Sequence, residues 1–166
     1  MKIYQTYKTV VLVIGLLPSI IMGNLGAATN YIRAGAVGSQ NGGNWTDAFT
    51  NFPSVLDRGG TYLVAGGTYP SKTFNDAVSG TNLIAIRHAS TNDHGTSTGW
   101  SDAYGTNAVL YPLTFSQGYY LIDGLSGGGP GEWTNGFGFR IKGILAGYDY
   151  LTQFRVGGSN VSFRHV

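Results

Sequence analysis

The sequence predicts an all-β protein in which short strands stack along a coil, with a short helix covering the amino-terminal end of the stack. Three observations support this fold class. Glycine supplies 27 of the 166 residues, against about 7 % in an average chain, so the chain turns often. Short apolar stretches separated by turn residues fill the chain beyond residue 60, whereas helical spacing occurs in a single stretch before it.

Residues 1–28 are predicted to be an export signal. Lys2 and Lys8 make a basic start, a long apolar run follows, and small residues precede the expected cleavage after Ala28. The alternative is a retained membrane anchor, because no charge occurs between Lys8 and Arg33 and a membrane span needs only about 20 residues. Proline and glycine interrupt this run, which favours cleavage. We therefore expect a secreted or cell-surface protein, extracellular or periplasmic, that is free of the membrane after cleavage.

The composition narrows the class of protein further. The formal net charge of +2 falls to zero once the two signal lysines are removed, so a nucleic-acid partner lacks electrostatic support. The chain has no cysteine, which excludes disulfides and thiolate metal sites. Hydrophobic residues make up 42 % of the chain and charged residues 11 %, so the chain can bury a core.

Residues 29–60 are assigned to an amino-terminal strand and the capping helix. The apolar residues of the helical stretch recur at steps of three and four, namely Trp45, Ala48, Phe49, Phe52 and Leu56. This spacing predicts a helix over residues 45–56. Asn44 or Thr46 caps its start, Gly59 ends it, and Pro53 turns its last part into an irregular turn. Its apolar face would cover the exposed end of a stack of strands.

Residues 61–166 carry the strands. Strand-like stretches occur at 61–66, 82–89, 108–115, 119–126, 137–143, 150–158 and 160–166. A sandwich or barrel is the alternative to a coil, but three stretches share one plan, in which alternating apolar residues are closed by Gly124, Gly143 or Gly158. A spacing of about 20 residues between such closing glycines suits rungs that stack on one another. The last stretch has no closing cap, so we expect these residues to be the first rungs of an incomplete coil.

The stretch from Gly59 to Ser71 reads as the first rung. Two alternating pairs are able to point inward, either Leu63 with Ala65 or Tyr62 with Val64. Residues 66–67, both glycine, allow a sharp change of direction at a rung corner. The Gly-Thr-Tyr triplet that follows marks the next corner.

Residues 43–69, GNWTDAFTNFPSVLDRGGTYLVAGGTY, resemble the start of secreted bacterial right-handed parallel β-helix proteins of the pectate-lyase-like superfamily. That pattern has a Trp-x-x-Ala-Phe helix, a Gly-Asp-Thr-like turn, an apolar strand and a Gly-Thr-Tyr ending. The turn here is Gly-Gly-Thr at residues 59–61, without the acidic residue. Residues 93–105 and 119–133 are also similar to members of this group. The resemblance covers about residues 30–166 and implies a right-handed parallel β-helix, or solenoid.

Members of this superfamily commonly bind or cleave polysaccharides on the outside of the coil. Some use calcium held by acidic residues, with a basic residue as proton acceptor. No catalytic motif of the family is matched in this chain, so the resemblance assigns no catalytic residue and no metal ligand set. Calcium is the one cofactor that it implies.

The polar loop 90–106 is the predicted carbohydrate-binding site. Its candidate residues are Asp93, His94, Trp100, Asp102 and Tyr104. The carboxylates are oxygen ligands for calcium, His94 is a base or hydrogen-bond donor, and the two aromatic rings stack on sugars. The favoured alternative is a loop that folds over the coil, with Trp100 and Tyr104 buried as its own small core and Asp93 capping a turn.

Two Arg-His pairs lie at strand ends, Arg87 with His88 and Arg164 with His165. Adjacent strand residues point to opposite faces, so neither pair converges on one ion. We expect outward arginines and inward, hydrogen-bonded histidines. Asp123 is expected to hold a turn through its carboxylate rather than to bind calcium.

The resulting functional hypothesis is an exported monomer that binds an extracellular polysaccharide and cleaves it as a lyase or glycosidase. The alternative is a non-catalytic surface or adhesion module in which the coil serves as a stalk or recognition surface. The loop 90–106 is the site in the first hypothesis.

Overall fold

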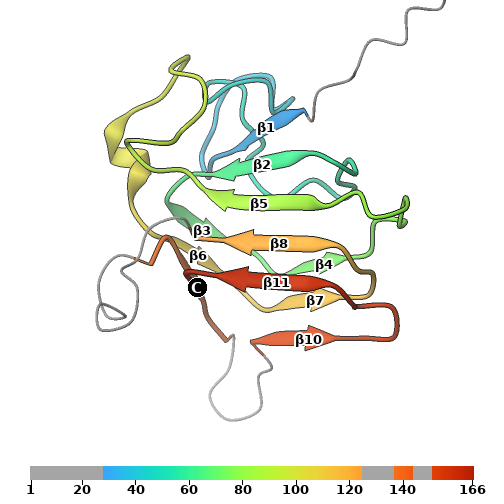
Figure 1. Ribbon diagram of the computed structural model, residues 1–166. Helices are drawn as coiled ribbons and strands as arrows, with labels where there is room; N and C mark the ends of the chain where they lie inside the picture. The colour runs from blue at the N-terminus through green and yellow to red at the C-terminus, as the bar shows by residue number, and fades with distance from the viewer. Residues whose placement is uncertain (1–27, 125–136, 144–150) are drawn as a thin grey trace, which may run out of the picture.

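The computed structural model describes residues 28–124, 137–143 and 151–166, a part of the chain rich in strands (Figure 1). The strands are β1 (Thr29–Ile32), β2 (Thr61–Val64), β3 (Gly67–Tyr69), β4 (Lys72–Phe74), β5 (Ile84–His88), β6 (Ala108–Leu110), β7 (Leu113–Phe115), β8 (Tyr120–Asp123), β9 (Phe139–Ile141), β10 (Thr152–Phe154) and β11 (Val161–Arg164). One short 3₁₀ helix, η1 (Asp102–Gly105), is the only helix in these ranges. The predicted signal lies outside the described residues, apart from Ala28. No described helix has the length and apolarity of a membrane span.

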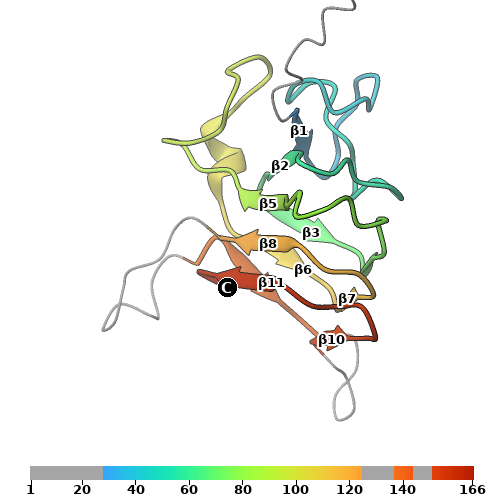
Figure 2. The ribbon, with the colours of Figure 1, turned by 45° about the vertical axis from the view of Figure 1, so that its right-hand side comes forward.

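The strands form three sheets in which every pairing is parallel. Sheet A has the order β1-β2-β5-β8-β11, sheet B the order β3-β6-β9, and sheet C the order β4-β7-β10. From β2 onward the chain enters A, B and C in constant rotation, so each strand pairs with the strand three places further along. We call one passage through the three sheets a circuit. Figures 1 and 2 show the strands of sheet A stacked in chain order, with sheets B and C on the other sides of the core.

The all-β prediction is confirmed, and every predicted strand region beyond residue 60 contains a strand. Residues 108–115 hold two strands, because the chain turns from sheet B into sheet C at Tyr111 and Pro112, and proline lacks the amide proton that would continue a ladder. The second Gly-Thr-Tyr, predicted as a corner, is β3, and β4 was not predicted. Strands of three residues are too short to produce a recognisable alternation in the sequence.

The prediction of one rung per glycine-closed stretch is wrong. The three glycine-closed stretches contain one strand of each sheet. β8 of sheet A precedes Gly124, β9 of sheet B precedes Gly143, and β10 of sheet C precedes Gly158. They are the three sides of one circuit and do not stack on one another. Residues that do stack on one another come from the same sheet in successive circuits. In sheet A, for example, Ala85 pairs with Thr61 on one side and with Leu121 on the other.

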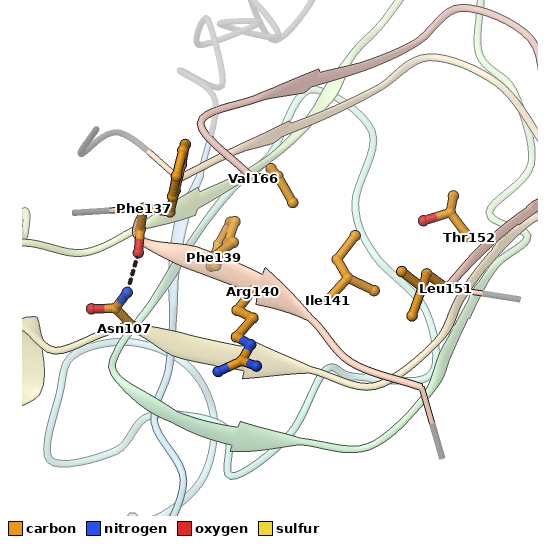
Figure 3. A pocket seen from close by; sticks show the side chains of 8 residues that line it. All are labelled: Asn107, Phe137, Phe139, Arg140, Ile141, Leu151, Thr152 and Val166. Atoms are coloured by element: carbon orange, nitrogen blue, oxygen red, sulfur yellow. Dashed lines mark hydrogen bonds between the residues drawn. The ribbon is translucent and has the colours of Figure 1, made fainter. Parts of the chain in front are cut away.

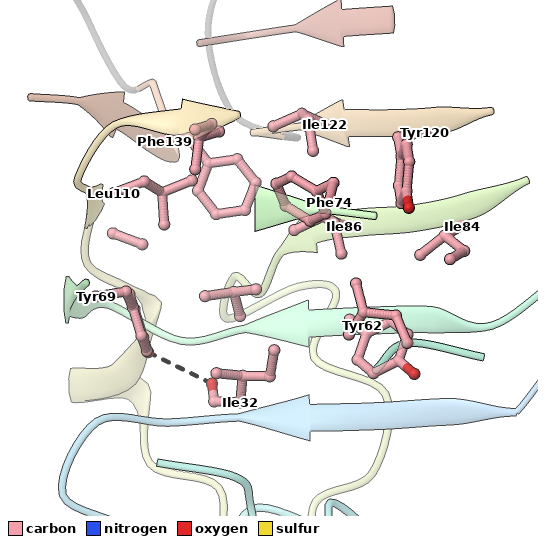
Figure 4. Packing of buried hydrophobic residues seen from close by; sticks show 14 of the residues in the cluster. Ile32, Tyr62, Tyr69, Phe74, Ile84, Ile86, Leu110, Tyr120, Ile122 and Phe139 are labelled. Carbon is pink, nitrogen blue, oxygen red and sulfur yellow. Dashed lines mark hydrogen bonds between the residues drawn. The ribbon is translucent and has the colours of Figure 1, made fainter. Parts of the chain in front are cut away.

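The side chains that point between the three sheets form one core (Figure 4). Its largest members with almost no exposure are Ile32, Tyr62, Tyr69, Phe74, Ile84, Ile86, Leu110, Leu113, Phe115, Tyr120 and Phe139. Parallel register places similar side chains at the same level, so the Phe74 and Phe115 rings stack with centroids 4.7 Å apart. Burial of each such side chain stabilises the fold by roughly 1.5–3 kcal/mol.

Sheet A is buried on both faces at its amino-terminal end. Tyr62 and Val64 belong to the central core. Leu63 and Ala65 point outward, into a second cluster with Trp45 and its neighbours. Both pairs considered in the sequence are therefore buried, because chain segments before β2 and after β5 cover the outer face of the sheet.

The predicted helix over residues 45–56 is wrong, because this segment is extended and irregular. Its backbone groups bond to other segments rather than along a helix. Phe49 donates its amide proton to Tyr31 (2.9 Å), Arg33 donates to Phe49 (2.8 Å), and Trp45 donates to Thr98 (3.1 Å). The segment thereby covers the outer edge of β1, the strand that would otherwise be exposed.

The helical spacing in this segment has another origin. Trp45 and Ala48 belong to the second cluster, whereas Leu56 belongs to the central core. The apolar residues thus face two different clusters and not one side of a helix. Asn44 does accept the amide protons of Thr46 and Asp47 (2.9 and 3.0 Å), as a helix cap would, but these bonds close a turn.

A buried polar network ties residues 54–58 to the core. The Asp76 carboxylate, 6 % exposed, accepts the Leu56 amide proton (2.7 Å) and the Tyr120 hydroxyl proton (2.9 Å). The Arg58 guanidinium lies over the Tyr120 ring and donates to the backbone carbonyls of Asp76 and Gly118. Burial, reinforced by the hydrogen bond to Asp76, raises the pKa of Tyr120. These bonds attach residues 54–58 to the segment after β4 and to the start of β8.

His88 gives the fold a pH dependence. The residue is 1 % exposed, and its Nε2 donates to the Thr106 carbonyl (2.8 Å), while the buried Nδ1 has no hydrogen-bond partner among the described residues. Burial lowers the pKa of His88 below its ordinary value of 6.5, against the opposing effect of the hydrogen bond to Thr106. The expectation of an inward His88 is confirmed.

The unfolded chain protonates His88 more readily than the folded chain does. The contribution of neutral His88 to the free energy of unfolding is therefore present above pH 6.5 and is lost as the pH falls through the lower pKa of the folded state. We expect the urea midpoint to fall between about pH 7.5 and about pH 5, and His88→Gln to show a smaller fall than the natural chain. Equal falls in the two proteins would contradict this role.

Candidate carbohydrate-binding site

The predicted loop, residues 90–106, folds back over the outer face of β1 and β2 (Figure 1). Hydrogen bonds join the loop to a β1 side chain and to the segment that follows β2. Tyr31 Oη accepts the Thr96 amide proton (3.1 Å), and the Tyr104 carbonyl accepts the Gly66 amide proton. Gly95 has a φ of +68°, and a Cβ there would lie 2.7 Å from Tyr31 Oη, so only glycine fits this crossing.

Aromatic rings hold the loop in place. The Trp100 indole stacks on the His94 ring, with centroids 4.4 Å apart and an angle of 8°, and also contacts Trp45 and Tyr104. The Arg33 guanidinium lies 4.8 Å from the Tyr104 centroid. The Trp45 Nε1 proton is donated to the His94 carbonyl (2.9 Å). The rings predicted to stack on sugars are therefore engaged with protein partners.

The two carboxylates of the loop have separate partners. Asp93 forms an ion pair with Arg87 (3.0 Å), and Asp102 accepts the Trp100 Nε1 proton (3.1 Å). In the described ranges no group of three or more His, Asp or Glu side chains is close enough to share a metal ion. The described residues of the loop thus do not form a calcium ligand set. The structure brings His94, Trp100, Asp102 and Tyr104 together and holds Asp93 against β5.

A charged row crosses the outer face of sheet A beside this loop. Arg87, Asp123 and Arg164 occupy the same outward position on β5, β8 and β11. The Asp123 side chain is only 10 % exposed. Arg87 forms an ion pair with the loop residue Asp93, so the row adjoins the loop at the carboxyl ends of the strands.

His165 completes this surface. Its Nδ1 lies 2.9 Å from Asp123 Oδ1, and its side chain is 42 % exposed. A carboxylate only accepts, so Nδ1 carries the proton, and Nε2 has no hydrogen-bond partner in the described part of the chain. His165 was expected to point inward, and this expectation is wrong. Its backbone has a φ of +51°, which turns the side chain out of the strand alternation and onto Asp123.

The row was missed because its members are far apart in the sequence. Each of its strands reads apolar, any residue, apolar, charged: IAIR at 84–87, YLID at 120–123 and VSFR at 161–164. An alignment of these stretches by that pattern would have placed the charges side by side. Asp123 was expected to hold a turn, and this stays a prediction; within the described residues its carboxylate accepts the His165 Nδ1 proton.

The fold and the site define a strand-rich protein with three all-parallel sheets and a charged outer surface flanked by an aromatic loop. No family model, curated protein or solved structure gives a significant match to the chain.

Proposed function

We propose that the protein is an exported right-handed parallel β-helix that binds an extracellular polysaccharide on the outer face of sheet A. The constant rotation through three parallel sheets supports a coil, since stacked repeats in which each contacts only its neighbours make a solenoid. The right-handed sense follows from the strong general preference for right-handed connections between parallel strands.

The observation that carries the binding proposal is the charged row. Guanidinium groups donate paired hydrogen bonds to carboxylates and to neighbouring oxygens. Arg87 and Arg164 lie on either side of Asp123, and the exposed His165 ring lies beside them. Sugar hydroxyls and sugar carboxylates both suit such a surface, because each needs hydrogen-bond partners arranged along an extended chain.

Cleavage by a lyase or glycosidase needs a group that exchanges a proton with the sugar. His165 is held by a carboxylate through Nδ1 and is open at Nε2 in the described part of the chain. A carboxylate that fixes the tautomer of a histidine is the usual arrangement for a proton acceptor. In the catalytic form of the proposal His165 takes this role. In the alternative, a surface or adhesion module, the same face binds without turnover.

The proposal is tested by affinity electrophoresis of the whole chain through gels that contain acidic or neutral polysaccharides. Arg87→Ala is expected to weaken retention about tenfold, because it removes one charge-assisted contact. Arg155→Ala is the matched control, since Arg155 follows β10 in sheet C and its side chain donates a hydrogen bond to Gln153, its one side-chain hydrogen bond within the described ranges. No retention on any gel, or equal losses in both variants, would contradict the proposal. Retained binding without new reducing ends or unsaturated products would favour the adhesion module.

Trp100→Ala separates sugar stacking from loop packing. The ring is engaged by His94, Trp45 and Tyr104, so we expect a loss of about 2 kcal/mol in unfolding free energy, less than for a fully buried tryptophan. Weaker retention at unchanged stability would show instead that the indole contacts the polysaccharide. Thermal melting and the same gels measure both quantities.

A further inference from the structure

His88 joins the base of the loop 90–106 to the core. It lies on β5, two residues before the loop begins, and its Nε2 donates to the carbonyl of Thr106, the last residue of the loop (2.8 Å). His88 is 1 % exposed, whereas Thr106 is exposed. A buried side chain thus closes the loop from beneath, at a point where the loop borders solvent.

The ring of His88 is enclosed on its other side as well. The Phe139 ring lies edge-on to it, with centroids 5.8 Å apart, and a Cβ added at Gly138 would lie 2.5 Å from its Cγ. Its Nδ1 has no hydrogen-bond partner among the described residues. A second proton would enter at Nδ1 and would find no described acceptor there.

The side chains on the inner faces of sheets A and B offer no opposite charge. Apart from His88, the described ionisable side chains on these faces are three tyrosines, and burial raises the pKa of each. They are therefore neutral both in acid and at pH 7. The tyrosines are Tyr62, Tyr69 and Tyr120.

The charged side chains near the ring belong to outer faces. Arg87 on β5 and Asp123, its paired position on β8, both point outward, and Arg140 on β9 is exposed. The loop carboxylates, Asp93 and Asp102, are each bonded to another side chain. A protonated ring would thus be a buried charge without a described counter-charge, and water or loss of the proton would relieve it.

The loop is able to lift while the sheets stay paired, because both of its ends adjoin fixed points. Before the loop, the Ala89 amide proton is donated to Val64 in sheet A (2.8 Å). After the loop, the Asn107 side chain donates to the Phe137 carbonyl, as Figure 3 shows. Residues 90–106 therefore form the unit that moves.

Backbone amides mark the contact between this unit and the rest of the fold. Their protons are lost to solvent when the loop lifts, so each reports on its position. The described contacts run from Gly66 to the Tyr104 carbonyl, from Trp45 to the Thr98 carbonyl and from Thr96 to Tyr31 Oη.

We propose that a proton on His88 opens the loop 90–106 from its base and admits water to the ring, while the three sheets stay paired. The open loop uncovers the second cluster, in which Leu63 and Ala65 are buried. The loop is thus a strap that covers an apolar face at neutral pH and releases it in acid. Its opening is independent of polysaccharide binding, so the two are tested separately.

Amide hydrogen exchange in the whole chain, followed by NMR, tests this coupling. His88→Gln keeps a donor toward Thr106 and takes up no proton, so the two proteins are compared at the same pH. At about pH 5 we expect the Gly66 and Thr96 amides to exchange at least about fivefold faster in the natural chain, because opening frees His88 to titrate near its ordinary pKa of 6.5. At about pH 7.5 the rates should be equal. The control is the Asn82 amide, in the turn before β5, which should not differ at either pH.

Three results would overturn the proposal. The first is an equal rate at Gly66 and Thr96 in the two proteins at about pH 5. The second is a gain only at the Ala108 amide, which donates to Gly138, because the opposite wall of the ring would then be the one that opens. The third is a loop that exchanges no faster than Ala85 in sheet A, because the whole fold would then be opening.

A single cysteine under the loop measures the same opening without a change at His88. The chain has no cysteine of its own, so Ala65→Cys places one thiol in the second cluster. Its reaction with a pyridyl disulfide, relative to a short cysteine peptide, is expected to rise at least about fivefold from about pH 7.5 to about pH 5. Low urea should leave this rate unchanged, because lifting a loop exposes little surface. A rate that does not rise in acid, or that climbs with urea as steeply as unfolding does, would contradict the opening.

Discussion

Replacement of Asp76 by alanine is expected to lower the free energy of unfolding by about 3 kcal/mol. The carboxylate is 6 % exposed and satisfies two buried donors, the Leu56 amide and the Tyr120 hydroxyl. Its loss would leave both donors without an acceptor and would remove the negative charge beside Arg58. Residues 54–58 would then lose their attachment to the core, although the sheets below would keep their own pairing.

Urea unfolding followed by circular dichroism measures this change. Asp57→Ala is the matched control, because Asp57 is exposed and its removal should alter stability by no more than about 0.5 kcal/mol. Asp76→Asn, which keeps an acceptor of the same shape, should fall between the two. A similar small effect for Asp76→Ala and Asp57→Ala would show that the network does not fasten this segment.

Phe115→Ala is the second large effect, with an expected loss of about 3–5 kcal/mol. The ring has no exposure and lies between Phe74 and Phe154, with Tyr120 and Phe163 at its edges. Because its neighbours lie in β4 on one side of β7 and in β8, β10 and β11 on the other, the cavity would weaken the packing between the circuits before and after β7.

Phe154→Ala is the comparison for this prediction, since it removes the same side chain from the same position one circuit later. Phe154 is 53 % exposed, so its removal should cost only about 1 kcal/mol. The same urea series provides both values. A loss at Phe154 as large as at Phe115 would mean that the end of the stack is covered in solution.

The fold class was predictable because its signals are local. Glycine frequency, apolar alternation and turn residues are visible without knowledge of pairing, and β2, β5, β8 and β11 all lie in predicted strand regions. Which strands pair was not predictable in the same way. Three strands of different sheets make one circuit, and loops such as residues 90–106 change the spacing between equivalent strands, so no fixed period remains to be found.

The error over residues 45–56 has a physical basis. A spacing of three and four residues indicates a helix only when all the apolar residues face one surface. Trp45 lies against the loop and Leu56 lies in the central core, so the chain satisfies the spacing by passing between two apolar clusters. The free edge of β1 competes for the same backbone groups, and strand-like bonds to Tyr31 and Arg33 replace a helix.

The candidate site shows the same division between local and long-range information. The five predicted residues of the loop were identifiable by type, but their partners were not. His94 and Trp100 stack on each other, and Arg87, which anchors Asp93, lies on a strand. The charged row depends on register between strands that are far apart in sequence, and register is a property of the assembled sheet.

The central claim is that the chain passes through three sheets in one rotation, so that each strand from β2 onward pairs in parallel with the strand three places further along. Backbone nuclear Overhauser effects in an isotope-labelled sample test it most directly. The account predicts contacts of Thr61 with Ala85, Tyr62 with Ile86 and Leu63 with Arg87, in which both residue numbers rise together. Contacts in which one number rises while the other falls, or contacts between β2 and β3, would contradict it.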